Sequence, residues 1–322
     1  MTSRSRFTFH DLAPGEESFR DAVLKGLGRT PKSIPCKFFY DARGSALFEA
    51  ICGLPEYYLT RTEVAILEEN AAEIAAQIGA HSRLIEFGSG ASTKARILLR
   101  ALDRPAAYVP VDISREHLRD AAISLAEDFP SLHVVAVCAD YTRAFPLPPL
   151  PGPSGKRVGF FPGSTIGNFE PPQVVTFLAD WAALLGPGGE MLIGVDLKKD
   201  PKILDAAYND KAGMNAAFNL NLLARINREL GGDFDVDRFA HVAFYNEAQG
   251  RVELYLKSLA EQTVTVAGQH FRFGAGELIH TENSYKYSIA EFRALAVRAG
   301  FQTLETWTDP DGMFGVYYLR RD

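Results

Sequence analysis

The stretch Leu84-Ile85-Glu86-Phe87-Gly88-Ser89-Gly90-Ala91-Ser92-Thr93-Lys94 decides the fold of this chain. An apolar run ends at an acidic residue, a Gly-x-Gly turn follows, and a helix-forming segment begins at Lys94. This order predicts a strand, a tight turn and a helix, the opening unit of a nucleotide-binding α/β domain. The two glycines permit a sharp turn and the close approach of a ligand, because a side chain at either position would obstruct both.

The turn does not match the dinucleotide-binding fingerprint. That fingerprint, Gly-x-Gly-x-x-Gly, requires a third glycine where this chain has Thr93, which argues against an NAD oxidoreductase. Glu86 lies two residues before the first glycine. The pattern Glu-x-Gly-x-Gly is typical of methyltransferases that use S-adenosylmethionine (SAM), in which the turn faces an amino acid and a ribose. For this motif taken alone, an ordinary strand–helix turn remains the alternative.

Two later strand ends carry further acidic residues. The run Tyr108 to Asp112 predicts a second strand, and its carboxylate lies 24 residues after Gly88, a spacing that suits an acid on ribose hydroxyls. The run Val134 to Tyr141 predicts a third strand, which ends at Asp140 and is followed by an aromatic ring. Ligands of this fold bind beyond the carboxyl ends of the strands. Three successive acids there favour a ligand site over solvated loop carboxylates.

Composition indicates a soluble globular protein of one large or two modest domains. The net charge of −6 and the lack of a Lys/Arg-rich run argue against nucleic-acid binding, and no apolar run is long enough to span a membrane. Residues 1–10 lack a signal-peptide core. Cys36, Cys52 and Cys138 are too widely spaced for a disulfide framework, so we expect a cytoplasmic protein. The histidines show no paired spacing, and we expect no metal site.

Residues 1–60 are dense in aromatic side chains interleaved with charge. Helices are predicted over the ranges 17–27, 46–51 and 63–78, and Thr62 is placed to cap the third of them. This segment is either a packed cap on the main domain or a lid, because tyrosine rings with hydroxyl groups suit a small polar substrate.

The second half of the chain begins with a predicted fourth strand and its exit loop, Val158 to Phe169, in which Gly163 indicates an unusual backbone. Asn168 offers a donor and an acceptor to a methyl acceptor there, or else it caps the next helix. A fifth strand ends at Asp196. An insertion of helices and short antiparallel strands is then predicted over the ranges 203–208, 216–230, 240–245, 251–258, 262–266 and 270–273. A helix and a closing hairpin follow, with the last strand antiparallel.

Five runs spread along the chain carry a family resemblance. They are Phe39-Tyr40-Asp41-Ala42-Arg43-Gly44-Ser45, Glu56-Tyr57-Tyr58, Glu86-Phe87-Gly88-Ser89-Gly90, Phe161-Pro162-Gly163-Ser164-Thr165-Ile166-Gly167-Asn168 and Thr281-Glu282-Asn283-Ser284. Together they resemble the L-histidine Nα-methyltransferase family, whose members make hercynine, the betaine of histidine, in ergothioneine biosynthesis. The resemblance runs almost end to end.

The resemblance implies an α/β chain of two domains. A Rossmann-like SAM methyltransferase sheet, its last strand antiparallel, would comprise residues 61–196 and 287–322. A smaller α+β substrate domain would comprise residues 1–60 and 197–286 and close over the first. The implied ligands are SAM and the small molecule L-histidine, without a metal, and the implied oligomeric state is a monomer.

The resemblance also implies site residues. The SAM-binding set would be Tyr40, Gly88, Gly90, Lys94, Asp112, Asp140 and Tyr141. The substrate-binding set would be Tyr58, Gly163, Asn168, Tyr208, Asn215, Leu254, Glu282 and Ser284. Tyr58, Asn168 and Tyr208 would be catalytic. Leu254 and Asn215 stand where the family pattern has Met and Thr, which leaves the shape and polarity of the substrate site open.

The residue types suit the chemistry. SAM carries a sulfonium cation, and an ammonium has no lone pair, so the substrate amine must be neutral and aligned with the S–CH3 bond. Tyrosine and asparagine orient an amine without repelling the sulfonium, and aromatic faces tolerate a growing quaternary cation. Glu282 could accept an imidazole N–H and favour a charged ring, or it could be a surface carboxylate.

Two other functions remain open at this point. One is the same reaction on a different amino acid or small amine. The other is a non-catalytic SAM-fold binding protein, in which Tyr58, Asn168 and Tyr208 would not converge on the SAM methyl group.

Overall fold

The structure, a computed structural model, describes residues 6–12, 19–90, 92–143, 145–153 and 155–321. The chain divides into two compact units. Unit 1 comprises residues 1–15, 61–198 and 287–322, and unit 2 comprises residues 16–60 and 199–286. Each unit is therefore assembled from segments that lie far apart in the sequence.

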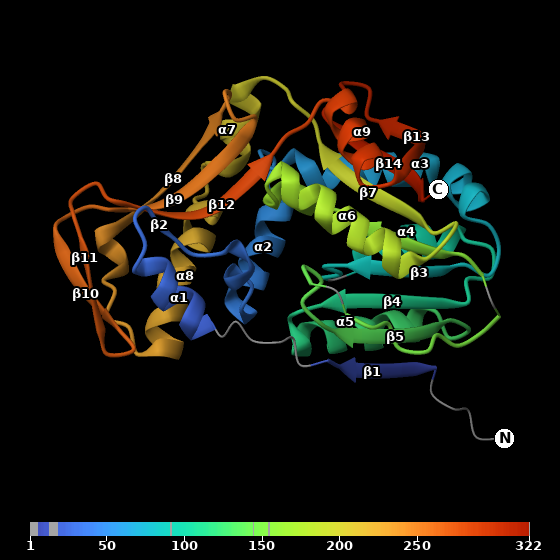
Figure 1. Cartoon of the computed structure of the whole chain (residues 1–322), viewed down its shortest axis with the longest axis horizontal. Coiled ribbons are helices and arrows are strands. Elements are labelled where there is room, and N and C mark those ends of the chain that lie inside the picture. Colours follow the sequence, from blue (N-terminus) through green and yellow to red (C-terminus); the bar gives the residue numbers. More distant parts are fainter. Residues whose placement is uncertain (1–5, 13–18, 91, 144, 154, 322) are drawn as a thin grey trace. The chain divides into compact units, whose positions relative to one another are not determined.

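Unit 1 is built on an eight-stranded sheet (Figure 1). In spatial order its strands are β1 (Phe7–Asp11), β5 (His133–Cys138), β4 (Ala107–Asp112), β3 (Arg83–Phe87), β6 (Arg157–Phe161), β7 (Glu190–Asp196), β14 (Phe314–Arg321) and β13 (Phe301–Thr308). Neighbouring strands are parallel except that β14 runs antiparallel to both β7 and β13. The predicted Rossmann-like sheet with an antiparallel last strand is confirmed.

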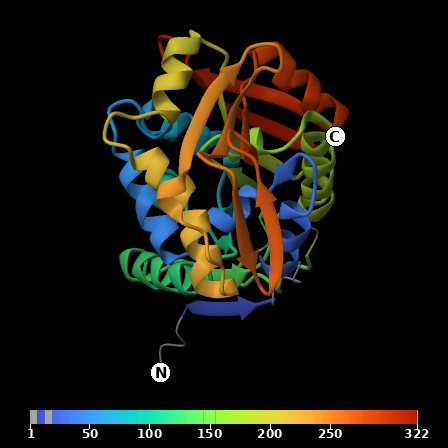
Figure 2. The same ribbon diagram turned by 90° about the vertical axis from the view of Figure 1, so that its left-hand side faces the viewer.

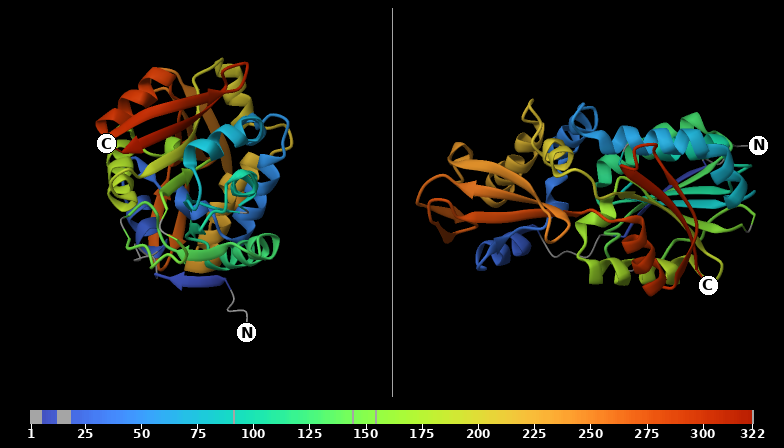
Figure 3. Two further views of the ribbon diagram at one scale, coloured as in Figure 1. Left: turned by 90° about the vertical axis from the view of Figure 1, so that its right-hand side faces the viewer. Right: turned by 90° about the horizontal axis from the view of Figure 1, so that it is seen from above.

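Helices cover both faces of this sheet (Figure 3). One face carries α3 (Tyr58–Ile78), α4 (Thr93–Ala101) and α5 (Arg115–Asp128), and the other carries α6 (Pro171–Leu185) and α9 (Ile289–Arg298). The central strands are consequently apolar and buried along almost their whole length, as in β4 and β7. This double cover explains why the strands read as continuous apolar runs in the sequence.

The first strand corrects the predicted domain bounds. The prediction that residues 1–60 belong to the substrate domain is wrong for β1, which pairs in parallel with β5 and forms one edge of the unit 1 sheet. A single short strand ahead of a helix carries no signal for the sheet that it joins, because strand pairing is a long-range choice. The helices that follow, from Phe19 onwards, lie in unit 2.

Unit 2 is an α+β unit with a four-stranded sheet (Figure 2). In spatial order the strands are β2 (Lys32–Ser33), β12 (Leu278–Tyr285), β9 (Arg251–Ser258) and β8 (Phe239–Asn246). A separate hairpin pairs β10 (Gln262–Val266) with β11 (Gln269–Phe273). The helical segments are α1 (Phe19–Leu27), α2 (Ala42–Cys52), α7 (Pro201–Tyr208), α8 (Met214–Leu230) and two short 3-10 helices, η1 (Cys36–Phe39) and η3 (Val236–Arg238).

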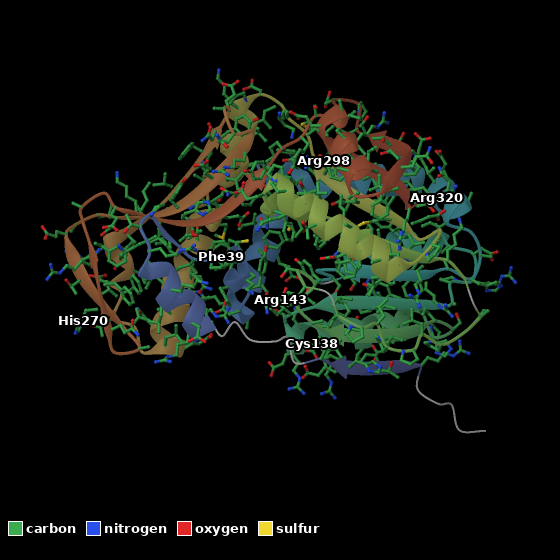
Figure 4. All side chains as sticks on the ribbon, in the orientation of Figure 1. Phe39, Cys138, Arg143, His270, Arg298 and Arg320 are labelled. Carbon is green, nitrogen blue, oxygen red and sulfur yellow. The ribbon has the colours of Figure 1, made fainter. Side chains whose placement is uncertain are left out.

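The run Phe39 to Ser45 is a packing motif inside unit 2. Asp41 caps α2 by accepting a hydrogen bond from the Gly44 amide at 2.6 Å, and it accepts another from Asn221 of α8 at 2.9 Å. Phe39, labelled in Figure 4, is fully buried. A Cβ atom at Gly44 would lie 1.8 Å from the Phe39 carbonyl oxygen, so only glycine allows this approach. The motif fixes the backbone on both sides of Tyr40.

Helix α3 begins earlier than predicted. Its first residue is Tyr58, so Thr62 lies within the helix and the proposed cap at Thr62 is wrong. The prediction places the cap at a Ser or Thr that precedes the apolar pattern. The tyrosines before Thr62 fit the same pattern, so the sequence does not show that the helix begins earlier. No helix in the described part of the chain has both the length and the apolar character needed to cross a membrane.

The close approach at Gly44 generates a stability prediction. Gly44→Ala should lower the free energy of unfolding by about 1–3 kcal/mol, because the new methyl group must displace the Phe39 carbonyl or the helix start. Gly53→Ala is the matched control, since a Cβ there makes only an ordinary contact of 3.5 Å with the Ala50 carbonyl. Chemical denaturation of both variants measures the difference, and equal midpoints would contradict the packing argument.

Candidate active site

The carboxyl end of β4 holds the glycine turn in place. Asp112 accepts hydrogen bonds from the backbone amides of Gly90, at 3.2 Å, and Ser114, at 2.9 Å. Burial raises the pKa of Asp112 above its usual value, although both amides oppose that shift. Each carboxylate oxygen accepts one of these bonds and has capacity for another, which suits a pair of ribose hydroxyls.

Tyr141 packs against the same turn. Gly88 has a φ of +68°, and a Cβ atom there would lie 3.3 Å from the Tyr141 hydroxyl oxygen. The adjacent Asp140 accepts hydrogen bonds from the Thr142 amide and hydroxyl, at 3.0 and 2.5 Å. Figure 4 shows Cys138 at the end of β5 and Arg143 beyond it, which marks this edge of the sheet.

This arrangement fits SAM better than a phosphate ligand. The turn combines two glycines at positive φ with a carboxylate and a phenol, and a carboxylate would repel a phosphate. Among the described residues, a Cβ atom at Gly90 would meet no atom within 4 Å, which leaves room for a ligand there.

The side chain of Glu86 is buried inside unit 1, whereas the strand-end pattern predicts that it faces a ligand. Its side chain is buried, with 1% of its surface exposed, and it accepts a hydrogen bond from the Tyr108 hydroxyl. The same hydroxyl also bonds to Ser92 Oγ at 2.9 Å, in the turn that precedes α4. Burial raises the pKa of Glu86 to about 8, against the opposing effect of the Tyr108 hydrogen bond. Glu86 therefore supports the turn from inside the unit.

Lys94 is paired with a residue that the sequence did not single out. Its ammonium forms an ion pair with Glu63 of α3, and the same carboxylate oxygen accepts a hydrogen bond from the Gly163 amide at 2.8 Å. Glu63 is completely buried, and a Cβ atom at Gly194 would lie 2.1 Å from its Oε1 atom. Glu63 thus joins α4 to the exit loop of β6. No local pattern marks it, because the contact spans distant segments.

Asn168 is the last residue of a 3-10 helix, η2 (Thr165–Asn168). It does not cap α6, because Glu170 is the N-cap and forms a capping box with Gln173. The turn before η2 has Gly163 at φ +81° and Ser164 at φ +57°, and Ser164 Oγ accepts a hydrogen bond from the Asp196 amide at 2.9 Å. The loop is therefore tied to the end of β7, and the alternative role of Asn168 as a cap is excluded.

In unit 2 the structure brings Tyr208 and Ser284 together. The Tyr208 hydroxyl donates to Ser284 Oγ at 2.8 Å, and the Lys286 ammonium donates to both oxygens at 2.9 Å. All three side chains are buried. Lys286 was not predicted, although a lysine two residues after Ser284 on an alternating strand was the available signal.

Glu282 lies directly opposite Leu254 in the ladder between β12 and β9. Burial raises the pKa of Glu282 to about 7, and the charge of Lys286 opposes this shift. Burial and then the charge of Glu282 raise the pKa of Cys36, and the pKa of Tyr57 is raised chiefly by burial, with Glu282 a minor contributor. Tyr57 packs edge-on against Tyr208 at 6.3 Å between ring centroids. Tyr57 therefore belongs to this cluster, although the predicted site contains only its neighbour Tyr58.

The backbone beside Tyr208 is held from several sides. Asn215 donates to the Ala207 carbonyl at 3.1 Å and to Asp210 at 2.8 Å, which uses both of its amide hydrogens. His241 bonds to the Tyr208 carbonyl at 2.9 Å. Asn215 therefore fixes the end of α7, and only its carbonyl oxygen remains to meet a ligand.

The remaining predicted tyrosines of unit 2 have their own partners. The Tyr58 hydroxyl accepts a hydrogen bond from Lys199 at 2.6 Å, and Tyr58 is almost fully buried. Tyr40 packs edge-on against Phe48 and Phe218, at 5.6 Å from each ring centroid. Lys199, like Lys286, is a lysine bonded to a predicted substrate-binding tyrosine.

The buried carboxyl group of Glu86 generates a pH prediction. Because its pKa is about 8 in the folded chain and 4.5 in the reference state, the folded chain holds a proton that the unfolded chain loses as pH rises. Its stability contribution therefore falls between pH 4.5 and 8. Glu86→Gln cannot ionise, so it should gain stability relative to wild type by up to about 1.4 kcal/mol per pH unit across that window.

Denaturation at pH 5, 6, 7 and 8 measures this difference for Glu86→Gln. The control is Glu127→Gln, a substitution at an exposed position of α5. Parallel stability curves for wild type and Glu86→Gln would show that Glu86 is ionised throughout.

Comparison with known proteins agrees with this geometry. Residues 19–321 match the model of a family described as histidine-specific methyltransferase, SAM-dependent. The chain is 43% identical over 305 residues to the histidine N-alpha-methyltransferase of Mycolicibacterium smegmatis, covering 93% of this chain and 94% of that protein. It is 41% identical to the protein of the same name from Mycobacterium tuberculosis, covering 94% of each.

A third relative is longer. Ergothioneine biosynthesis protein 1 of Neurospora crassa is 33% identical over 285 residues, which cover 86% of this chain and 32% of that protein. The family model spans both units of the chain, including the segments that carry the glycine turn, Tyr208 and Glu282. This protein is therefore a member of the SAM-dependent, histidine-specific methyltransferase family.

Proposed function

We propose that this chain is an L-histidine Nα-methyltransferase that uses SAM to convert histidine into its trimethylated betaine, hercynine, in ergothioneine biosynthesis. The observation that carries the proposal is the cluster in unit 2, in which Glu282 faces Leu254 across the ladder and Tyr208 bonds to Ser284. A carboxylate, a hydroxyl and an apolar wall match the groups of an imidazole ring. The names of the mycobacterial and fungal relatives support the substrate and the pathway.

Unit 1 would hold the co-substrate. When bound, SAM supplies a methyl group attached to a sulfonium. The residues of unit 1 that would bind it are Gly88, Gly90, Lys94, Asp112, Asp140 and Tyr141. Tyr40 is also part of the proposed SAM-binding set. Asp112 would accept hydrogen bonds from the ribose hydroxyls, since both of its oxygens retain accepting capacity. Lys94 would meet the amino-acid part, with its charge balanced by Glu63.

Unit 2 would orient the substrate. Glu282, Ser284 and Tyr58 would meet the imidazole, and Leu254 would form the apolar wall beside it. Tyr208 would meet the carboxylate and amine region. Gly163 and Asn168 are the residues of unit 1 that we propose for substrate binding. Asn215 would act indirectly, because its hydrogen bonds fix the end of α7.

The reacting amine must be neutral before each transfer. The ammonium groups of Lys199 and Lys286 give the tyrosine cluster a positive charge. A positive environment disfavours a protonated amine, so these lysines would promote the neutral form. Tyr58, Asn168 and Tyr208 would then align its lone pair through neutral hydrogen bonds. Solvent can accept the proton of the free ammonium before it binds. The methylated ammonium formed by the first and by the second transfer must also lose a proton, which solvent can accept after that intermediate is released.

We further propose that the protein is a monomer and that it works in the cytoplasm. Cys36, Cys52 and Cys138 all lie in the described part of the chain and are thiols, which suits a reducing compartment.

A product assay tests the proposed reaction. Incubation with SAM and a mixture of amino acids should add three methyl groups to histidine, detected by mass spectrometry as a gain of three CH2 units on that amino acid alone. Methylation of a different amino acid or amine would replace the substrate assignment, and SAM binding without any methylated product would indicate a binding protein.

Two substitutions should each weaken the binding of a different ligand. Asp112→Ala should weaken SAM binding, because the ribose hydroxyls lose their acceptor, and Glu282→Ala should weaken histidine binding by about 2 kcal/mol while leaving SAM affinity near wild type. Calorimetry with each ligand measures both. Asp120→Ala and Glu261→Ala, at exposed positions in the respective units, are the matched controls. Unchanged histidine titration in Glu282→Ala would remove Glu282 from the substrate site.

A further inference from the structure

Lys286 stands at the end of β12 with 1% of its surface exposed. Its ammonium lies 2.9 Å from the hydroxyl oxygens of both Tyr208 and Ser284. An ammonium carries three hydrogens and no lone pair, so it can only donate. Both hydroxyl oxygens must therefore accept a hydrogen bond from Lys286.

The direction of the Ser284 hydroxyl follows from this constraint together with the direction of the Tyr208 hydroxyl, which donates to Ser284. Ser284 Oγ accepts one bond from Lys286 and a second from the Tyr208 hydroxyl, at 2.8 Å. Two bonds fill the accepting capacity of a hydroxyl oxygen. The O–H of Ser284 is left to donate, and within residues 6–321 as far as the structure describes them it has no acceptor.

Glu282 provides a hydrogen-bond acceptor on the same face of β12. It lies two residues before Ser284 on β12, and side chains two residues apart point to the same side. An ionised carboxylate only accepts hydrogen bonds. The face of β12 therefore presents an acceptor and, one pleat further on, a donor.

We propose that Lys286 is a positioning residue that makes Ser284 a hydrogen-bond donor, so that unit 2 selects a ring with one bare nitrogen and one N–H. The inference rests on the proposed function. Neutral imidazole has this pattern, with its N–H on Glu282 and its bare nitrogen on Ser284. Imidazolium has two N–H groups, and one of them would meet the Ser284 donor close to the Lys286 charge. The bound ring is therefore neutral, although a carboxylate alone would favour the charged form.

The charged and titratable groups around this face support the same outcome. Lys286 adds a positive charge, Glu282 adds a negative one, and the nearby Tyr57 and Cys36 have pKa values raised by burial and then by their charged neighbours, so both are neutral near pH 7. Because Lys199 bonds to Tyr58, the cluster already holds two ammonium groups against one carboxylate, and an imidazolium would add a further positive charge to it.

The direct test is nitrogen NMR of histidine labelled with 15N in its ring and bound to the wild-type protein in the presence of S-adenosylhomocysteine. At pH 8, where Glu282 is ionised, the bound ring should show one protonated and one bare nitrogen, whereas a ring charged by its carboxylate partner would show two protonated nitrogens. Two protonated nitrogens in the bound ring would overturn the inference.

Substrate analogues test the role of Lys286 itself. A pyrrolylalanine, which keeps the N–H and replaces the bare nitrogen by C–H, should bind wild type about tenfold more weakly than histidine, because the Ser284 donor loses its acceptor. In Lys286→Met the Ser284 hydroxyl can turn to Tyr208, so this preference should fall towards unity while SAM affinity stays at the wild-type level.

The variant Ser284→Ala provides the matched control. It should lose the preference for histidine over the pyrrole, and adding Lys286→Met to it should change the preference no further, since Lys286 acts through Ser284. A wild-type preference retained in Lys286→Met overturns the inference. The proposed function fails separately, because it requires only that wild type bind histidine and release hercynine.

Discussion

Charged groups buried inside each unit must find partners, and this requirement organises the edges of both sheets. In unit 1 Glu63 joins Lys94 to the Gly163 amide, and Glu190 at the start of β7 gathers Lys156, Tyr318 and Arg320. In unit 2 Lys286 performs the corresponding role for two hydroxyl groups. Each buried charge connects strands or helices that are distant in the sequence, so the loops that carry the candidate ligand residues are held by the interior.

The fold could be predicted from the sequence wherever local pattern determines structure. The glycine turn after β3 and the acids at the ends of β4 and β5 lie where their spacing indicated, because strand, turn and helix are short-range choices. The partner of β1 could not be predicted, since it depends on which sheet edge is vacant. The same limit applies to Glu63, whose role arises from a contact with a lysine 31 residues away.

The candidate site divides in the same way. The family motif indicated Glu282, and the ladder places it opposite Leu254, but its role toward a ligand stays a prediction. Glu86 belongs to the most recognisable motif of the chain and yet points inward, because Tyr108 provides a hydroxyl partner inside the unit. Motif membership therefore does not separate residues that could face a ligand from residues that support the backbone. The sequence does not indicate a role for Lys286, because a lysine at the end of a strand is ordinarily solvated.

The position of β14 has a consequence for biosynthesis. This strand lies between β7 and β13, and it is translated after every other strand that the structure describes. Until it emerges from the ribosome, the backbone N–H and C=O groups along one side of β7 have no strand to pair with. An apolar strand with such an open edge is a template for intermolecular pairing. The nascent chain thus carries an unpaired strand edge from the synthesis of β7 until that of β14, and pairing of β14 with β7 removes it.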